Sequence, residues 1–421
     1  MSLQSLRALF LAFIAALLVS ACGGSSSSSK APPPPVDGIS VVPGDSQVTV
    51  TWKETPGVEY WIFAAPNSPN LSLTNWLATT GATYRLKVTS PFVVTGLAND
   101  VPYSFFLTGR VNSGPGGAAT PTVISTPRLA GNYWTTGATL NTGTPLGLTY
   151  GSYVDTATNT YVYSYLAVGK GGKLLKASTI DAWTDMTPIV TSDLRAAEFG
   201  ISKFIAAGAG GTVIYSTDLQ TWTQSTSVTT QNINAMAASP SMVIAVGDNG
   251  TIIKSTDAIS WTTAATVPST AHLYGVAYSG SGTWMAVGAA GTILTSTDGD
   301  TWTSQTSGNN ANLKAAGVLS TLVNNTYTYQ YLAVGESGTI LRSVDGITWT
   351  TQTAVNANTL NAVSAINQFL VVGNNGTIIT SPDGITWSQK TSTTQADLKT
   401  LLRAANQYIA VNTAGGIISS Q

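Results

Sequence analysis

Two residue types that often carry chemistry, histidine and cysteine, occur once each in the 421-residue sequence, as His272 and Cys22. A protein metal cage needs several ligands that converge on one ion. A nucleophilic triad needs a histidine held between an acid and a nucleophile. We expect neither arrangement around a lone histidine and interpret His272 as a loop residue. The sequence therefore predicts no metal, no cofactor and no disulfide.

Two glycine-rich segments have the composition of phosphate-binding loops, GKGG at 169–172 and GAGG at 208–211. Phosphate loops act through the N-terminus of a helix that follows the glycines. Here strand-like segments lie on both sides of the glycines, so no such helix is expected. We interpret both segments as β-turns that use glycine for its backbone freedom.

Five aspartates recur at one position of a repeated segment. STDGDTW at 296–302 returns as STDLQTW at 216–222, STDAISW at 255–261, SVDGITW at 343–349 and SPDGITW at 381–387, with a shorter copy, STIDAW, at 178–183. Serine and aspartate side chains at such positions hydrogen-bond the backbone of a turn. We therefore assign a structural turn role and no catalysis to Asp218, Asp257, Asp298, Asp345 and Asp383.

The motif belongs to a longer repeat of four strands. At 360–387 the segments LNAVSAI, FLVVG, TIITS and ITWSQ alternate with turn signals, and the motif tryptophans recur every 38 to 47 residues, the length of a propeller blade. The middle strand ending in AVG or its equivalent occurs seven times, but the last copy stops before its tryptophan. GNYWTTG at 131–137 offers the missing outer strand. The sequence predicts an all-β protein in which 128–421 form a seven-bladed β-propeller closed by N- and C-terminal strands.

The repeat resembles two propeller families. Its turn is similar to the Asp-box of BNR propellers, in a form one residue shorter between Asp and Gly. The whole unit, AVGxxGTIxxSxDGxTW, is closer to the photosystem II assembly-factor-like propellers of the sialidase superfamily. The resemblance implies a fold and leaves function open among a binding module, an envelope assembly factor and a glycoside hydrolase or sialidase-like enzyme.

The residues of a sialidase site are largely missing. That chemistry needs three arginines around a substrate carboxylate, a tyrosine nucleophile paired with a glutamate, and an acid/base aspartate. The arginines of the repeats are Arg195, Arg342 and Arg403, and Arg342 falls in a third strand, away from the central mouth. The Phe/Tyr-Arg-Ile-Pro signature of the family is absent. We therefore expect a protein without enzymatic activity.

Polar residues that differ from blade to blade are expected around the mouth of the central channel. In a four-stranded meander, the loops from fourth to first strand and from second to third strand share one face, and the Asp turns lie on the other. Varied loops on a fixed scaffold are where recognition usually resides, although a solvated rim without a ligand is the alternative. The candidate binding residues follow the opening Leu or Ile of each first strand or lie in adjoining loops: Arg195, Asn234, Tyr274, Lys314, Asn361 and Lys399, with Lys170, Asp248 and Glu336.

Two first hairpins are longer than the others and rich in tyrosine, YGSYVDTATNTYVYSY at 150–165 and TLVNNTYTYQY at 321–331. Tyrosine offers a large contact area with little rotamer entropy, which suits contact with a protein or a glycan. Strand propensity alone also accounts for these tyrosines. The hairpins are a second candidate binding surface.

The N-terminal residues form a targeting segment. Arg7 precedes the apolar stretch ALFLAFIAALLV, and VSAC places small residues before Cys22. This resembles the lipobox of bacterial lipoproteins, which implies a signal peptide over 1–21 and a lipidated Cys22 on a Ser/Pro-rich tether at 22–36. Gly23 is not the Asp that retains lipoproteins in the inner membrane, so the resemblance implies the outer membrane or cell surface. An ordinary secretory signal is the alternative.

Residues 37–127 alternate in strand fashion between turns. The segment VVTGLANDVPYSFFLTGRVNSGPG resembles the second half of a fibronectin type III domain, with Leu97 and Tyr103 in the places of its tyrosine corner and Trp52 in the place of its core tryptophan. The resemblance implies a sandwich that acts as a spacer or binding module.

Composition bounds the partners. Charged residues make up 9% of the chain, the formal net charge is −1, and no run of lysine or arginine occurs, so nucleic acid is not an expected partner. We predict a monomeric, lipid-anchored, noncatalytic binding or assembly module that recognises a protein or a glycan through the propeller mouth.

Overall fold

The computed structural model describes residues 31–112, 114–140, 145–404 and 406–420. The predicted signal peptide at 1–21, the lipidation of Cys22 and most of the tether lie outside the described residues. Within them the chain is built from strands and short 3₁₀ turns with no α-helix, which confirms the all-β prediction. A search of these residues also finds no helix with the length and apolar character to cross a membrane. The chain divides into two compact units, Met1–Ala130 with Gln421, and Gly131–Ser420.

The first unit contains two antiparallel sheets, ordered β1-β2-β5 and β4-β3-β6-β7. The strands span β1 (Ser40–Gly44), β2 (Gln47–Thr51), β3 (Glu59–Pro66), β4 (Thr83–Val88), β5 (Phe92–Thr95), β6 (Tyr103–Arg110) and β7 (Val123–Ser125), with the 3₁₀ turn η1 at Trp76–Ala78.

The two sheets of this unit share one core. Val50 of β2 and Leu107 of β6 are fully buried in the same cluster, and Trp52 packs there with its ring edge-on to Tyr60. The Tyr103 hydroxyl accepts a hydrogen bond from the backbone N–H of Ala98 at 3.1 Å. These residues carry the fibronectin type III resemblance, which stays a prediction.

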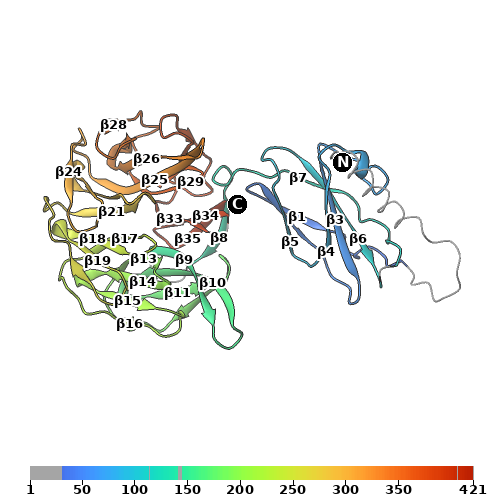
Figure 1. Cartoon of the computed structure of the whole chain (residues 1–421), viewed down its shortest axis with the longest axis horizontal. Helices are drawn as coiled ribbons and strands as arrows, with labels where there is room; N and C mark the ends of the chain where they lie inside the picture. Colours follow the sequence, from blue (N-terminus) through green and yellow to red (C-terminus); the bar gives the residue numbers. More distant parts are fainter. Residues whose placement is uncertain (1–30, 113, 141–144, 405, 421) are drawn as a thin grey trace. The chain divides into compact units, whose positions relative to one another are not determined.

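The second unit consists of four-stranded antiparallel sheets that follow one another along the chain (Figure 1). Six sheets are each made by consecutive strands. Their strands are β9 (Pro145–Asp155), β10 (Thr160–Gly169), β11 (Leu174–Ala177) and β12 (Trp183–Met186); β13 (Leu194–Gly200), β14 (Lys203–Gly208), β15 (Val213–Ser216) and β16 (Thr223–Gln224); β17 (Ile233–Ala238), β18 (Val243–Gly247), β19 (Ile252–Ser255) and β20 (Thr262–Thr263); β21 (Leu273–Tyr278), β22 (Trp284–Gly288), β23 (Ile293–Ser296) and β24 (Thr303–Gln305); β25 (Leu313–Val323), β26 (Thr326–Gly335), β27 (Ile340–Ser343) and β28 (Thr350–Thr351); and β29 (Leu360–Ile366), β30 (Gln368–Gly373), β31 (Ile378–Ser381) and β32 (Ser388–Gln389).

A further sheet joins the two ends of this unit, in the order β33-β34-β35-β8. Its strands are β33 (Leu398–Ala404), β34 (Gln407–Asn412), β35 (Gly416–Ser420) and, from the start of the unit, β8 (Thr135–Thr139). Ser419 pairs with Thr135 and Ile418 with Thr136. Each first strand also contacts the first strand of the next sheet, and β33 contacts β9. The sheets therefore form a closed ring (Figure 1).

The repeated motif forms the turn between third and fourth strands. Ser296 Oγ donates to Asp298 Oδ1 at 2.9 Å, and the same carboxylate oxygen accepts from the backbone N–H groups of Asp300 and Thr301, both at 2.8 Å. These backbone donors lower the pKa of Asp298 to about 2. The other four copies make the same bonds.

The fourth strands are shorter than the sequence suggests. In the copy at 381–387, the backbone N–H groups of Ile385 and Thr386 donate to Asp383, so they are not available to the ladder. Strand β32 therefore begins at Ser388, after the motif Trp387.

Between second and third strands the chain makes a tight 3₁₀ turn, η2 (Lys170–Gly172), η3 (Ala209–Gly211), η4 (Asp248–Gly250), η5 (Ala289–Gly291) and η6 (Glu336–Gly338). Gly250 has φ +68°, and a Cβ there would collide with the backbone carbonyl of Ser269. Its N–H donates to Ala271 at 2.9 Å, which ties the turn to the loop entering the next sheet. The glycines at 169–172 and 208–211 lie in such turns, with no helix after them among the described residues.

Candidate binding surface

Each candidate residue on a first strand lies at a β-bulge. The pairing register skips one residue in all six strands, for example between Ile233 and Ala235 of β17. A bulged residue is left out of the ladder and its side chain is redirected. The skipped residues are the six predicted from the sequence: Arg195, Asn234, Tyr274, Lys314, Asn361 and Lys399.

One group of these residues is linked from β13 to β21. Arg195 Nη1 donates to Asn234 Oδ1 at 3.0 Å. Asn234 Nδ2 donates to Asp248 Oδ1 at 2.8 Å and to the Leu273 carbonyl at 3.0 Å. The imidazole Nδ1 of His272 lies 3.1 Å from the same Asp248 oxygen. The side chains of three neighbouring sheets are thereby held together.

Asp248 is kept ionised by this arrangement. Burial would raise the pKa of its carboxyl, but hydrogen bonds from Asn234, Asn232 and His272 together hold the pKa below its ordinary value. Asn232 Nδ2 donates to the second carboxylate oxygen at 2.8 Å. Because every oxygen has a donor from the protein, Asp248 is built as a fixed acceptor.

The linked group continues from β21 into the next sheet, which contains β25. The His272 ring stacks on Tyr274, with centroids 6.5 Å apart, and Lys314 Nζ lies 4.4 Å from the Tyr274 centroid, in cation–π geometry. Lys314 Nζ also contacts Glu336 at 2.9 Å. The Lys314 hydrogen bond, with a second from Asn312, lowers the pKa of Glu336.

A second group joins the last two sheets. Asn361 Nδ2 donates to Asn374 Oδ1 at 2.8 Å and to the Leu398 carbonyl at 2.7 Å. Lys399 Nζ donates to the same Asn374 oxygen at 2.9 Å and lies 3.5 Å from Asp397. The structure thus brings every candidate residue but Lys170 into one of two linked groups. Lys170 is exposed in η2, and its ammonium has no partner among the described residues.

We call the nine candidate residues the mouth surface. Apart from Lys170, its cations are matched by carboxylates or amides, and its side chains are held by contacts with neighbouring residues. Such a surface can hydrogen-bond a partner without first ordering its own groups, which lowers the entropic cost of binding. The described residues contain no group of three His, Cys, Asp or Glu side chains that could hold a metal ion.

Comparisons with known proteins address this unit. A family model described as the DUF6242 beta propeller domain matches residues 203–313. A structure of YCF48 bound to a D1 peptide aligns with a TM-score of 0.52 at 18% identity over 70% of this chain and 99% of that one. Virginiamycin B lyase from Staphylococcus aureus aligns with a TM-score of 0.56 at 10% identity, over 69% and 99% of the two chains. A search of curated proteins finds no match.

The chain contains a β-propeller domain. The two solved structures named above are less than 25% identical to it, so they support the fold and leave the ligand open. The neighbours include a protein named as an enzyme and proteins that are not, which leaves activity undecided as well.

The three arginines of the repeats do not gather at one place in the propeller. Arg195 lies at the bulge end of a first strand. Arg342, at the other end of a blade, donates through Nε to Gln330 at 3.1 Å and to the Asp383 carbonyl of an Asp turn at 3.0 Å. Arg403 also lies far along its strand from the bulge and packs 5.0 Å from the Tyr408 ring centroid. Arg195 and Arg342 therefore face opposite sides of the ring.

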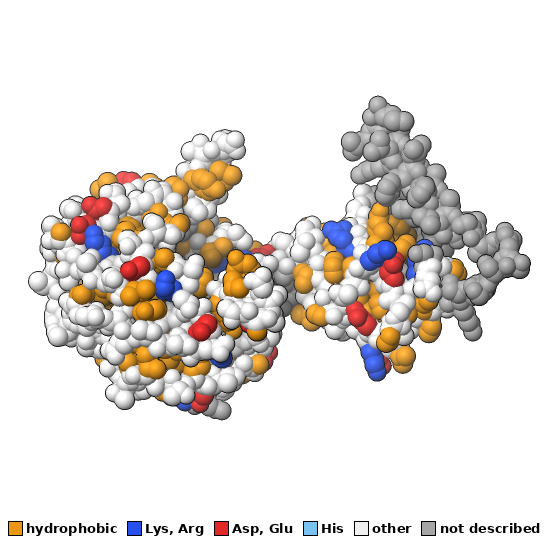
Figure 2. All heavy atoms as spheres, turned by 60° about the horizontal axis from the view of Figure 1, so that its bottom comes forward, with side chains coloured by type: hydrophobic (Ala, Val, Ile, Leu, Met, Phe, Trp, Pro, Cys, Tyr) orange, Lys and Arg blue, Asp and Glu red, His pale blue; other side chains and the backbone are white. Residues whose placement is uncertain are grey.

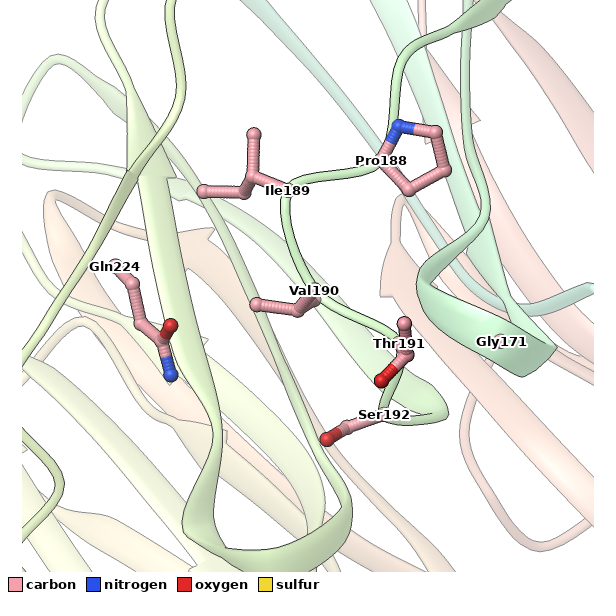
Figure 3. Close-up of a pocket in the computed structure, with 7 residues that line it drawn as sticks. All are labelled: Gly171, Pro188, Ile189, Val190, Thr191, Ser192 and Gln224. Atoms are coloured by element: carbon pink, nitrogen blue, oxygen red, sulfur yellow. The ribbon is translucent and has the colours of Figure 1, made fainter.

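A shallow cavity that the sequence did not predict lies between the first two blades (Figure 3). It has a volume of about 510 Å³ and is lined by η2, β16 and the segment 188–192: Gly171, Pro188, Ile189, Val190, Thr191, Ser192 and Gln224. No lining side chain is charged. The signal was the PIV sequence at 188–190, since the corresponding loops of the other blades have no run of three apolar residues.

The sequence also missed the residue before the opening Leu or Ile of each first strand. Asn232 Oδ1 accepts from the Gly210 N–H of the preceding blade at 3.1 Å, and Asp397 Oδ1 accepts from Asn375 at 3.0 Å. The position is polar in every copy, which was a usable signal: Asp193, Asn232, His272, Asn312, Thr359 and Asp397.

Proposed function

We propose that this protein is a noncatalytic binding or assembly module that captures a protein partner through the mouth surface of a seven-bladed, Asp-box-type propeller. One observation carries the proposal. The six bulge positions carry four residue types, Arg, Asn, Tyr and Lys, whereas the Asp turns and core strands around them have similar sequences from blade to blade. A varied surface on a fixed scaffold is the arrangement that recognition uses.

A protein partner is favoured over a glycan at this surface. The YCF48 neighbour is a structure with a bound D1 peptide, which is consistent with peptide recognition by this fold. The mouth surface offers both donors and fixed acceptors, as a peptide backbone requires. An envelope assembly role fits the same contacts, and a glycoside hydrolase or sialidase-like activity is the alternative function.

The proposal also places the protein on a membrane through a lipid on Cys22, with a fibronectin type III-like domain as spacer. Replacing Cys22 with Ala should move the protein from the membrane fraction to the soluble fraction and abolish incorporation of a fatty-acid probe. If the variant stays in the membrane fraction, the proposed lipid anchor on Cys22 is wrong, but the proposal for the mouth surface is unaffected.

The binding test removes the three cations of the mouth surface that lie at bulge positions. The variant Arg195→Ala/Lys314→Ala/Lys399→Ala should reduce capture of cross-linked envelope proteins by the immobilised full chain at least tenfold. Its thermal midpoint should fall only moderately, because the three half-buried side chains lose their bonds to neighbouring residues but none belongs to the buried core.

The matched control loses the same charge elsewhere on the propeller, as Lys176→Ala/Lys203→Ala/Lys390→Ala. Its capture should equal that of the parent. If both triple variants lose capture equally, the effect comes from net charge and the proposal is wrong. If the parent hydrolyses sialyl or other glycoside substrates and a mouth-surface variant does not, the proposed binding function is wrong and the enzyme is favoured instead.

A further inference from the structure

Two strands of the propeller carry the same tyrosine pattern. β10 reads TYVYSYLAVG and β26 reads TYTYQYLAVG. Residues two apart on a strand share a face. On each strand the innermost tyrosine, Tyr165 or Tyr331, is buried in the core, and the outermost is exposed, Tyr161 by 72% and Tyr327 by 59%.

The cross-strand neighbours on these faces also correspond. The middle tyrosines, Tyr163 and Tyr329, pair with Ser152 and Ser320. The outer tyrosines pair with an aliphatic residue, Val154 on β9 in one hairpin and Leu322 on β25 in the other, and both aliphatic side chains are exposed. We call each set of two tyrosines, a serine and an aliphatic residue a tyrosine face.

Other blades pack without first hairpins of this length. In the next blade, the first hairpin is short, because β13 and β14 are joined by a tight turn between Gly200 and Lys203. The β9–β10 hairpin instead extends well past its blade (Figure 1). Strand propensity favours tyrosine in general, but it does not produce the same order with the same cross-strand partners twice. Exposed aromatic rings grouped with aliphatic side chains mark interaction surfaces.

Charge indicates the kind of partner. The second hairpin has no charged residue from Ser320 to Gln330, and the first has only Asp155 between Tyr150 and Tyr165. Figure 2 shows how sparse charged side chains are over one face of the molecule. A neutral ligand meets no uncompensated charge at such a site, whereas a charged ligand would lose solvation without gaining a partner.

We infer that the two tyrosine faces bind one neutral polysaccharide chain at two points. The apolar C–H face of a sugar ring packs on a tyrosine ring, and the serine and tyrosine hydroxyls hydrogen-bond the sugar hydroxyls. A polymer of repeating units presents the same group to both faces, which explains why the face occurs twice. Two linked contacts bind far more tightly than either alone.

This surface is separate from the mouth surface. Lys314 lies at the start of β25, whereas Leu322 lies near its other end, at the hairpin. Loss of one activity therefore need not affect the other, and the two proposals can be tested independently.

The test is affinity electrophoresis of the full chain in gels containing hydroxyethyl cellulose, laminarin, galactomannan or dextran. At least one of these neutral polymers should retard the parent. Tyr161→Ser/Tyr327→Ser should weaken binding to that polymer at least a hundredfold, and each single variant about tenfold. For a short oligosaccharide of the same sugar, each single variant should lose only about half of the binding capacity, since one face remains.

Control variants alter the opposite sides of the same hairpins. Val162→Ser and Thr328→Ala should be retarded like the parent, as should the mouth-surface triple variant. Tyr161→Phe/Tyr327→Phe keeps the rings and should retain most of the binding even if the serine variants are poorly folded. The inference is overturned if none of the four polymers retards the parent, or if the double serine variant is folded and retarded normally. Capture of a protein that depends on both tyrosines, without polysaccharide binding, would assign the faces to a protein partner.

Discussion

At the residue scale, the environment of a side chain on a first strand depends on whether the residue lies at the bulge or within the hydrogen-bonded ladder. The bulge residues are released from the ladder and become available to solvent and to neighbouring blades. Three residues beyond the bulge of β13, Glu198 remains in the ladder, paired with Ile205. The other first strands carry uncharged residues at this register: Thr149, Ala237, Ala277, Gly317, Ser364 and Leu402. Burial raises the pKa of Glu198 to about 8, although part of the side chain still reaches solvent.

This glutamate should make stability depend on pH. Between about pH 4.5 and about pH 8 the folded protein keeps a proton on Glu198 that the unfolded chain has released. The free energy of unfolding is therefore expected to fall as pH rises through this window. Glu198→Gln should remove that slope and be more stable relative to the parent at pH 8 than at pH 5, as measured by urea denaturation.

Glu336→Gln is the matched control, because Lys314 lowers the pKa of Glu336 rather than raising it. In the parent, the interaction of Glu336 with Lys314 contributes fully to stability above the ordinary glutamate pKa and is lost only in more acidic solution. The slope between pH 5 and pH 8 should therefore match that of the parent. A Glu198→Gln profile parallel to the parent's would show that Glu198 is ionised in the fold.

At the element scale, the Asp turn requires one residue in the left-handed region. Gly299, Gly346 and Gly384 have φ near +70° at this position, and the two copies without glycine, Leu219 and Ala258, have φ of 55° and 60°. The turn geometry therefore overrides the side-chain preference. What differs between copies is the space around the residue.

Two alanine substitutions separate backbone strain from crowding. A Cβ on Gly299 would lie 2.7 Å from Ile244 Cδ1 of the neighbouring blade, whereas a Cβ on Gly346 would meet the Tyr331 ring at an ordinary 3.6 Å. Gly346→Ala should cost about 1 kcal/mol of unfolding free energy, from the left-handed backbone alone. Gly299→Ala should cost about 2–4 kcal/mol, because repacking of Ile244 adds to the same strain.

Thermal or denaturant unfolding measures both costs, and the difference between them is the informative quantity. Equal losses would mean that Ile244 yields freely to the added methyl group. Ala258→Gly at the same turn position provides a reference in which strain is relieved while one buried methyl group is lost.

At the scale of the whole propeller, closure depends on residues at opposite ends of the unit. Thr135 Oγ1 lies 3.3 Å from the Ser419 carbonyl across a sequence separation of 284 residues. The Gly131 N–H donates to Ser420 Oγ at 2.8 Å, and the buried Trp134 donates through Nε1 to the Gly131 carbonyl at 2.9 Å. In a closed ring every sheet packs between two neighbouring sheets. The ring therefore depends on this last sheet, because it joins the two ends of the chain segment.

Removing the tryptophan of the closing strand should therefore destabilise the propeller as a whole. Trp134→Ala is expected to cost about 3–5 kcal/mol of unfolding free energy, the usual cost of truncating a buried tryptophan. Trp349→Ala, in a continuous blade where the tryptophan is only partly buried, should cost less. Differential scanning calorimetry compares the two, and equal midpoints would mean that closure does not limit stability.

The sequence by itself determined the features that depend on near neighbours. Strand alternation, the glycine turns and the Asp turn arise from groups a few residues apart, as when Asp298 accepts from residues two and three positions later. The same spacing selected six candidate residues that share one position of their strands. Their bulges followed only from the pairing register, which periodicity does not reveal.

Only the tertiary structure decided what these residues contact. Arg195 meets Asn234 across a separation of 39 residues, and Gln407 donates to the Tyr165 hydroxyl across 242. Such contacts depend on how successive sheets turn around the ring, and no local pattern encodes that rotation. The raised pKa of Glu198 also depends on the tertiary structure, because it results from burial and β13 packs against the first strands of both neighbouring sheets, β9 and β17. Local hydrogen bonding specified each element here, and packing between elements specified the surface that the proposed function uses.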